Sequence, residues 1–399
     1  MTQTFFKDDA FNFKVQTMLG ELRTGCGDAG EILSTVARIT DGDDTSWVTE
    51  WQALGDRVAK IAKDAASEGH RVSARDAYLR ASAYYAAVLE AVDGVEHAEA
   101  ALKKAFTAHR ACFDEYVSRL DVPATKVAIP YGSSTMPGYF FTPAADGKKR
   151  PAVIVNNGSD GSVTSMLPFA LAACDRDYNA LIFDGPGQQS MLFEHGIPFR
   201  PEWEAVITPV VDFLGARADV DADRIALYGI SQAGYWVPRA VAFEHRIAAA
   251  VTDPGVVDVS TSWIEHLPKE MVKMLADNDR TTFDQWMSLG ESSETPAQKQ
   301  VLAWRGKPYG ITDPYDLFKA VEGYRLGDVT KQITTPLLVT DPEGEQFWPG
   351  QSEQLYAALP GPKALVKFTA AEGADRHCEP MARSLLEQRV FDWLDETLA

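Results

Sequence analysis

The sequence predicts an α/β protein with a mostly parallel sheet flanked by helices. Six short runs are apolar throughout rather than alternating, which is typical of strands that are buried on both faces. Helix-length segments separate most of these runs, as the connections between parallel strands require. The runs span residues 151–157, 179–184, 224–230, 247–253, 336–341 and 364–368.

Residues 1–122 are predicted to form a helical domain that precedes the sheet. In the stretch SARDAYLRASAYYAAVLEAV, the first residue, Ser73, can cap a helix, and Asp76 favours its first turn. Side chains then recur at helical spacing: Tyr78, Leu79, Ser82, Tyr85 and Val88 or Leu89. Packing between helices explains this stripe better than contact with a substrate does.

Two segments interrupt the regular alternation in the rest of the chain, 123–399. The stretch KVAIPYGSSTMPGYFFTP, residues 126–143, contains a Gly/Ser/Thr/Pro turn between two short strands and predicts a hairpin. About eighty residues, 255–332, separate the fourth apolar run from the fifth. They contain helical segments and six notable aromatic residues, Trp263, Phe283, Trp286, Trp304, Tyr309 and Tyr315. Because such an insertion lies at the carboxyl edge of a parallel sheet, where ligands bind, we expect it to be a lid.

The composition excludes several classes of protein. It is ordinary for a globular chain, with 45% hydrophobic and 24% charged residues. A net charge of −19 without a basic block argues against nucleic acid or a membrane surface as a partner. The four cysteines form no C-x-x-C pair, so neither a disulfide framework nor a zinc site is expected. With no signal-peptide pattern and no 18-residue apolar run, we expect a cytoplasmic protein without a metal or cofactor.

The stretch YGISQAGYW, residues 228–236, follows the third apolar run and contains a candidate nucleophile, Ser231. It nearly matches the Gly-x-Ser-x-Gly turn that presents a catalytic serine between a strand and a helix. Ala233 stands at the second glycine position, and the true glycine, Gly234, comes one place later. Since the bend needs small neighbours, alanine weakens this motif without breaking it.

Two partners for the serine follow later strands in the order serine, acid, histidine. His377 comes after the last run, and a histidine is suited to take the proton of a serine hydroxyl. Two acids compete to orient it. Glu345 lies four residues before Pro349, the spacing common in this kind of loop, whereas Asp341 lies at the strand end, where it can also cap a turn. The sequence favours Glu345 and keeps Asp341 as the alternative.

The backbone N–H of the residue after the nucleophile, Gln232, is expected to form half of an oxyanion hole. The loop NNGSDGS after the first apolar run supplies the other half, with Ser159 as the candidate. Asp160 is unusual there, because a carboxylate opposes a developing oxyanion. It either points at the substrate or a lid residue or forms a turn. The glycines of IFDGPGQQ, residues 182–189, lack the spacing of a phosphate loop and predict a tight loop at the edge of the site.

Eight segments together resemble a group of α/β hydrolases: GDAGEIL, DGDDTSWVTEW, GHRVSARDAYLRASAYY, IPYGSSTMPGYFF, DGPGQ, GISQAGYW, YGITDPYDL and GADRHCEP. The group comprises dihydroxypseudooxynicotine hydrolase, fungal hydrolases that shorten polyketide chains, and bacterial proteins called dipeptidyl aminopeptidase-like. The resemblance covers nearly the whole chain. It implies helices that pack over the hydrolase core and cover its site, a homodimer, and cleavage of ester-like bonds or of C–C bonds next to carbonyls. Asp160 stands where the nicotine-degrading relative has an acidic residue that helps to bind or polarise its substrate.

The sequence therefore predicts a serine hydrolase that needs no cofactor and acts on a small to medium aromatic or polyketide-like ester, lactone or ketone. An acyltransferase or a lactone-forming cyclase would use the same covalent intermediate and is the alternative. A binding protein that keeps the fold without catalysis is a third possibility, against which the serine, acid and histidine order argues. No feature marks a site for the amino group of a peptide.

Overall fold

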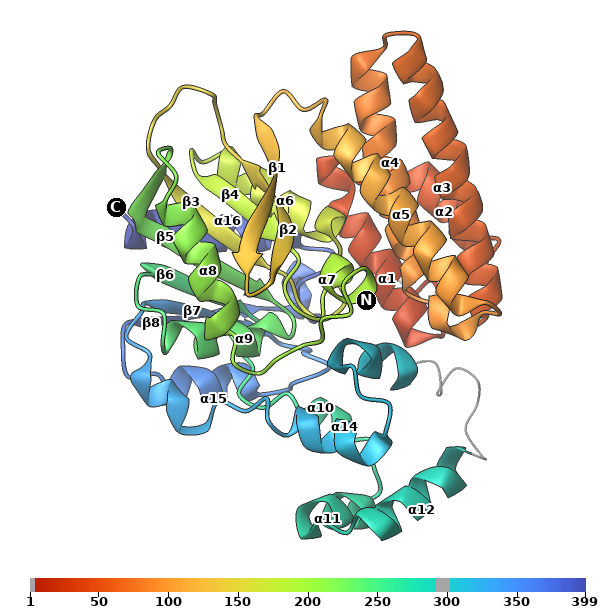
Figure 1. Ribbon diagram of the computed structural model, residues 1–399, viewed down its shortest axis with the longest axis vertical. Coiled ribbons are helices and arrows are strands. Elements are labelled where there is room, and N and C mark those ends of the chain that lie inside the picture. The colour runs from red at the N-terminus through yellow and green to blue at the C-terminus, as the bar shows by residue number, and fades with distance from the viewer. Residues whose placement is uncertain (1–3, 292–301) are drawn as a thin grey trace.

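The computed structural model describes residues 4–291 and 302–399, and within them one sheet has eight strands in the order β1-β2-β4-β3-β5-β6-β7-β8 (Figure 1). The strands are β1 Ala124–Tyr131, β2 Ser134–Phe141, β3 Arg150–Asn156, β4 Asn179–Phe183, β5 Val220–Ile230, β6 Ala249–Asp253, β7 Leu337–Pro342 and β8 Lys363–Phe368. The strands β4, β3, β5, β6, β7 and β8 pair in parallel, and β1 and β2 form an antiparallel hairpin at one edge. The predicted fold class is confirmed.

Helices cover both faces of the sheet. α6 (Val163–Cys174) and α16 (Arg383–Thr397) pack on one face, while α8 (Glu204–Gly215), α9 (Ala233–Val241) and α15 (Gln351–Ala358) pack on the other. Consecutive residues of β3 point to opposite cores: Val153 and Val155 join the core with α6, and Ile154 joins the core with α8 and α9. Burial on both faces explains why the strands are apolar throughout.

The N-terminal region is helical up to Val117. Its helices are α1 Asp9–Gly20, α2 Ala29–Val36, α3 Asp44–Ser67, α4 Arg71–Leu89 and α5 Ala98–Val117, with short 3₁₀ turns at Glu21–Thr24 and Val92–Gly94. α3 and α4 form a long hairpin that extends beyond the sheet (Figure 1). The Tyr85 ring packs against α3 at Gly55, where an added Cβ would come within 2.7 Å of it.

The expected cap at Ser73 is wrong, because α4 begins at Arg71 with His70 as its N-cap and no side-chain cap. The turn after α3 sets this start. Gly69 has a φ of +79°, and the His70 N–H donates to the Ala65 carbonyl at 2.9 Å, so the chain re-enters a helix at once. A left-handed glycine after a helix is a common C-terminal turn.

A buried ion pair joins the N-terminal helices to the sheet. Arg110 of α5 donates to Asp184, just after β4, at 3.0 Å, and the side chains are 12% and 2% exposed. Asp184 also accepts from the backbone N–H of Ser190 at 3.2 Å. Nearby, the Tyr139 hydroxyl of β2 donates to Asp114 of α5 at 2.6 Å. These contacts fix α5 against the loop that leads to the functional site.

Removing one partner of this pair should destabilise the protein strongly. We expect Arg110→Ala to lower the free energy of unfolding by about 3 kcal/mol, because the Asp184 carboxylate would be left buried without its cation. Arg38→Ala removes a cation from an exposed pair with Glu50 and should cost less than about 1 kcal/mol. Urea unfolding of both variants measures the two effects, and equal losses would contradict this prediction.

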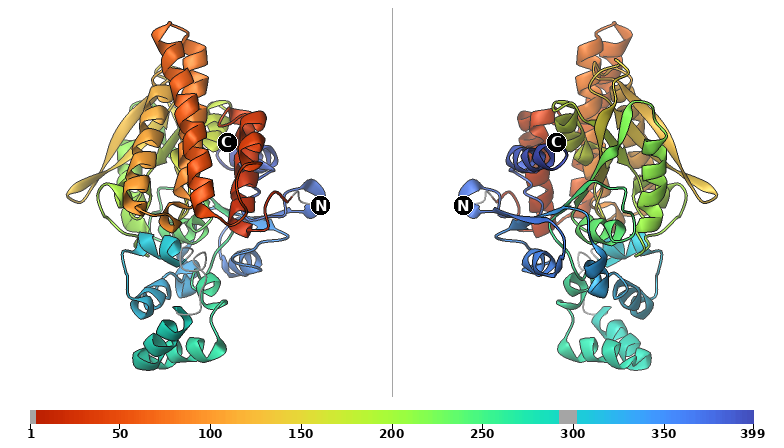
Figure 2. Two further views of the ribbon diagram at one scale, coloured as in Figure 1. Left: turned by 90° about the vertical axis from the view of Figure 1, so that its right-hand side faces the viewer. Right: turned by 90° about the vertical axis from the view of Figure 1, so that its left-hand side faces the viewer.

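The insertion between β6 and β7 forms a helical layer at the end of the molecule opposite the tip of the α3–α4 hairpin (Figure 2). Its described elements are α10 Thr261–Ile264, α11 Lys269–Asp277, α12 Arg280–Glu291, a 3₁₀ turn at Lys307–Tyr309, α14 Pro314–Val321 and a 3₁₀ turn at Gly327–Gln332. Residues 292–301 of the predicted lid lie outside the described residues. Elsewhere in the described residues, α7 Gln189–Phe193 follows β4, and a 3₁₀ turn at Ala370–Glu372 follows β8.

Most aromatic residues of this layer pack against one another. Trp263 meets Tyr309 edge-on at 5.5 Å, and Phe283 meets Tyr315 at 5.6 Å between ring centroids. Trp286 points outward and is 40% exposed. An aromatic-rich composition therefore reflects the layer's own core more than the walls of a substrate pocket.

Candidate active site

Ser231 lies on a sharp turn between β5 and α9. Its φ is +58°, a left-handed conformation that is uncommon for a residue with a side chain. Its backbone N–H donates to the carbonyl of Asp253 at the end of β6, at 2.6 Å, and its carbonyl accepts from Gly234 at 2.8 Å. The end of β6 therefore fixes the turn, and the serine side chain lies at the carboxyl edge of the sheet.

Small residues around the turn are required by close contacts. A Cβ on Gly229 would come within 2.4 Å of Val237 and 2.9 Å of the Ala233 methyl group. A Cβ on Gly234 would lie 2.0 Å from the Pro254 carbonyl oxygen. The Ala233 methyl group thus occupies space that Gly229 leaves open, which explains how alanine fits at the second glycine position of the motif.

The structure brings the three residues Ser231, His377 and Glu345 together in one chain of contacts. His377 Nε2 lies 2.9 Å from Ser231 Oγ. His377 Nδ1 lies 3.0 and 2.9 Å from the two carboxylate oxygens of Glu345. Because a carboxylate only accepts hydrogen bonds, the proton of a neutral His377 sits on Nδ1, and Nε2 is free to accept from the serine hydroxyl.

Glu345 is fixed as a charged acceptor. Its Oε1 also accepts from the backbone N–H groups of Phe347 at 2.9 Å and Trp348 at 3.2 Å. Burial alone would raise the pKa of Glu345, but His377 and these hydrogen bonds outweigh burial and hold the pKa below its usual range. The carboxylate therefore stays ionised beside the imidazole.

Asp341, the alternative acid, lies away from His377. It faces Lys367 of β8 at 3.5 Å, and its pKa is raised, mainly by burial. Three contacts tie the acid loop to the histidine loop: Glu343 accepts from the Ala370 N–H at 2.9 Å, the Gly344 N–H donates to the Asp375 carbonyl at 2.8 Å, and the His377 N–H donates to Gln346 at 3.2 Å. The longer glutamate side chain reaches the imidazole from a loop that the histidine segment holds in place.

The loop after β3 lies directly against the serine. A Cβ on Gly158 would come within 2.7 Å of the Ser231 Cβ, so only glycine allows this approach. Gln188, from the DGPGQ segment, donates to the carbonyls of Asn157 at 2.7 Å and Gly158 at 2.9 Å. The Gly158 carbonyl and the Ser159 N–H belong to the same peptide unit, and in a trans peptide these two groups point in opposite directions. Because the Gly158 carbonyl points toward Gln188, the Ser159 N–H points away from Gln188.

Neither predicted oxyanion donor is used elsewhere. Within residues 4–291 and 302–399, the backbone N–H groups of Ser159 and Gln232 have no hydrogen-bond acceptor in the protein. Gln232 precedes the first turn of α9, where the helix dipole is positive. Sequence reasoning missed Gln188, although its place in DGPGQ at the predicted edge of the site was a signal that could have found it.

Replacing Gln188 should impair catalysis through the loop that it positions. For Gln188→Leu we expect kcat to fall by roughly 10²-fold with KM little changed, because a displaced donor mainly destabilises the transition state. Steady-state kinetics on a substrate of the wild-type protein test this. A rise in KM with kcat unchanged would place Gln188 in substrate binding instead.

Helix α1 lies over the histidine. The Phe13 ring centroid is 6.2 Å from the His377 ring, and the Phe347 ring lies 4.6 Å from His377 and 6.4 Å from Phe13. His377 is 4% exposed as a result. The hydroxyl of Tyr309 in the insertion donates to Gln232 Oε1 at 3.4 Å. The site is thus enclosed between the first helix and the insertion, and Phe13 is a second residue that the sequence did not single out.

Asp160 lies on the wall of this enclosed space. Its side chain is exposed to this space and accepts from Ser159 Oγ at 3.0 Å. Burial raises the pKa of Asp160, and the charge of Glu90 adds to this, while Ser159, Arg305 and Lys14 act in the other direction. The two cations come from the insertion and from α1. The space beside the serine is therefore polar on this side.

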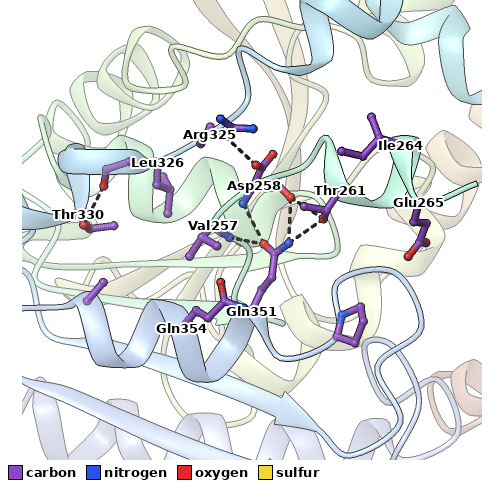
Figure 3. A pocket seen from close by; sticks show the side chains of 13 residues that line it. Val257, Asp258, Thr261, Ile264, Glu265, Arg325, Leu326, Thr330, Gln351 and Gln354 are labelled. Atoms are coloured by element: carbon purple, nitrogen blue, oxygen red, sulfur yellow. Dashed lines mark hydrogen bonds and ion pairs between the residues drawn. The ribbon is translucent and has the colours of Figure 1, made fainter. Parts of the chain in front are cut away.

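A cavity of about 670 Å³ lies apart from these residues (Figure 3). It is lined by the two ends of the insertion, within 257–265 and 325–330, and by α15. None of the predicted site residues lines it. Gln351 accepts from the Val257 and Asp258 N–H groups at 2.7 and 2.9 Å and donates to Thr261 at 2.8 Å, while Arg325 donates to Asp258 at 2.7 Å. These polar groups hydrogen-bond to one another and fix the insertion to the core. Because they are paired in this way, none of them is positioned to act on a ligand in the cavity.

In the part of the chain that the structure describes, no cluster of three or more His, Cys, Asp or Glu side chains could hold a metal ion. None of the described helices is long and apolar enough to cross a membrane.

A parallel sheet of this order, with a serine on the turn after β5 and helices on both faces, is the architecture of an α/β hydrolase. Hydrolase LUC6 from Fusarium sp is 30% identical to this chain over 98% of it and 97% of the relative. The 20-hydroxy-prefusarin hydrolase FUS2 from Gibberella moniliformis is 29% identical over 99% and 98%. The crystal structure of 2,6-dihydroxy-pseudo-oxynicotine hydrolase superposes with a TM-score of 0.73 at 19% identity, covering 95% of both chains. No protein-family model matches the chain.

The chain belongs to the α/β-hydrolase family, in which the fungal hydrolases LUC6 and FUS2 are its relatives, and it shares its fold with 2,6-dihydroxy-pseudo-oxynicotine hydrolase. It is accordingly a hydrolase.

Proposed function

We propose that the protein is a serine hydrolase in which Ser231 attacks a substrate carbonyl. The observation that carries this proposal is the contact chain in which His377 reaches Ser231 at 2.9 Å and Glu345 at 2.9 Å. His377 Nε2 takes the hydroxyl proton as Oγ bonds to the carbonyl carbon, and the negative charge passes to the carbonyl oxygen. His377 then returns the proton to the leaving group. Water, activated by His377, hydrolyses the acyl-enzyme in a second round.

Glu345 orients His377 and stabilises its charged form. The carboxylate takes no proton itself, because its lowered pKa keeps it ionised throughout. The N–H groups of Gln232 and Ser159 bind the oxyanion, and Gln188 positions the second of them. Two free donors beside one nucleophile match the charge that develops only in the transition state.

The substrate is proposed to be a small to medium aromatic or polyketide-like ester, lactone or ketone. The aromatic rings of Phe13 and Phe347 lie together beside His377 and favour an apolar or aromatic group near the scissile bond. Asp160 and Arg305 supply polar contacts for the rest of the molecule. The names of two relatives, for 20-hydroxy-prefusarin and for 2,6-dihydroxy-pseudo-oxynicotine, support an oxygenated substrate of this size.

A panel of aryl esters, lactones and β-diketones tests the proposed reaction, together with labelling by a fluorophosphonate probe. We expect turnover of at least one class and a single label on Ser231. Competing alcohols distinguish hydrolysis from acyl transfer, since an acyltransferase would give the new ester in preference to the acid. Absence of labelling in folded protein would refute the serine mechanism.

A further inference from the structure

Two buried carboxyl groups lie beneath the catalytic residues and take no part in the reaction described above. Asp253 ends β6, and Glu379 follows His377 by two residues. Both are 0% exposed. Each oxygen of Glu379 lacks a hydrogen-bond donor among the described residues. A buried ionised carboxylate without donors is costly, so this arrangement requires an explanation.

Asp253 is the point where the serine turn and the histidine loop meet. Its backbone carbonyl accepts from the Ser231 N–H at 2.6 Å and from the Cys378 thiol at 3.3 Å. Its carboxylate accepts from the Tyr228 hydroxyl at 2.7 Å and the Thr340 hydroxyl at 2.9 Å. Asp253 therefore already has donors, and each of its oxygens keeps a lone pair for one more.

Charge balance in this cluster indicates a bound proton. Among the described residues, Arg383 is the cation of this cluster: it lies 3.8 Å from Asp253, donates to the Cys378 carbonyl at 2.9 Å, and its charge acts on Glu379. Two ionised carboxylates beside one guanidinium would leave an uncompensated negative charge in the core. One proton removes that charge and turns Glu379 from an acceptor into a donor.

The ionisable groups around Glu379 also favour its protonated form. Burial and the charge of Asp253 raise the pKa of Glu379 well above its usual value, Arg383 opposes them, and Glu345 adds to the rise. Tyr228 and Cys378 also face the cluster, and burial raises the pKa of both groups, so neither adds a negative charge near neutral pH. Glu21 of the N-terminal region contributes a further carboxyl group near Arg383.

The histidine loop needs such an anchor. Cys378 and Glu379 both have positive φ values, +58° and +44°, in the left-handed region that residues with side chains disfavour. Two consecutive residues in this conformation directly after His377 persist only when contacts hold them. The Cys378 thiol and the Arg383 guanidinium hold the first of them.

We propose that Glu379 donates a hydrogen bond from a protonated carboxyl group to Asp253, and that this shared proton positions His377 against Ser231. Glu379 is thus a positioning residue for the proposed triad, and the inference rests on the proposed function. Above the pKa of Glu379 the proton leaves, two carboxylates face each other, and the histidine loop shifts. Activity should therefore fall at alkaline pH when Glu379 ionises.

Infrared spectroscopy tests the proton independently of any activity. The carbonyl stretch of a protonated carboxylic acid is absent from an ionised carboxylate. Near neutral pH we expect one such band in the wild type that is missing from Glu379→Gln. Identical spectra would overturn the proposal whether or not the protein proves to be a serine hydrolase.

Kinetics of three variants test the positioning role. Glu379→Gln keeps a neutral donor, so it should retain wild-type kcat and lose the alkaline decline. Glu379→Leu has no donor and should lower kcat by roughly 10- to 100-fold with KM unchanged. Glu387→Leu removes another buried glutamate, one that pairs with Arg23, and should leave kcat unchanged even if stability falls. A folded Glu379→Gln variant with the low activity of the leucine variant would overturn the proposal.

Discussion

Replacing Ser231 by alanine is expected to lower kcat by about 10⁶-fold, to the level left by binding and the oxyanion donors alone. The reason is that the alanine methyl group can neither attack the carbonyl nor donate a proton to His377, and no other group can replace the serine hydroxyl as the nucleophile. The turn itself should survive, because alanine is no larger than serine and the Ser231 backbone contacts with Asp253 and Gly234 do not involve the hydroxyl. Purified Ser231→Ala and wild type are compared on a substrate found in the ester and diketone panel.

Two measurements keep this result interpretable. Circular dichroism and the urea midpoint should match those of the wild type, so that lost activity is not lost folding. Binding of the substrate to the alanine variant should persist at close to the wild-type affinity. The substitution is first verified in the purified variant. If that variant then turns over substrate at more than a small fraction of the wild-type rate, Ser231 is not the nucleophile.

The second large effect concerns the acid. Glu345→Gln should lower kcat by about 10⁴-fold, because an amide can hold the imidazole in the wrong tautomer and cannot stabilise the imidazolium. The matched variant Asp341→Asn changes the other acid of the same loop region. It should change kcat by no more than roughly twofold, since its contact is a partly exposed ion pair with Lys367.

The ranking of these two variants is the decisive result. Both substitutions are nearly isosteric, so differences in packing contribute little. If Asp341→Asn reduced kcat more than Glu345→Gln, the histidine would be oriented by Asp341 in the working enzyme.

The sheet was predictable because its strands form short runs of apolar residues in the sequence. Runs that are apolar throughout, such as 151–157 and 336–341, correspond to β3 and β7 within a residue or two. Parallel strand ends meet at one edge, so the chain order of Ser231, Glu345 and His377 already implied their proximity. The count back from Pro349 favoured the acid that the structure places beside His377.

Contacts between distant segments were not predictable from pattern. Nothing in the local sequence of Phe13 connects it with His377, which lies near the other end of the chain. Gln188 acts through the carbonyls of Asn157 and Gly158, and a glutamine after Gly-Pro-Gly carries no sign of that partner. Composition likewise could not tell whether the aromatic residues of the insertion face the substrate or one another, because both arrangements bury the same rings.

The altered serine turn has a consequence for how substitutions combine. The Ala233 methyl group fits because Gly229 has no side chain, and a Cβ at 229 would meet both that methyl group and Val237. The two positions therefore differ in which substitutions they tolerate. Ala233→Gly should be nearly neutral in the present background, whereas alanine at 229 stays forbidden by Val237 whichever residue occupies 233. Sequence drift can accordingly erase the second glycine of the motif while the first persists, and searches that demand both glycines would overlook hydrolases of this kind.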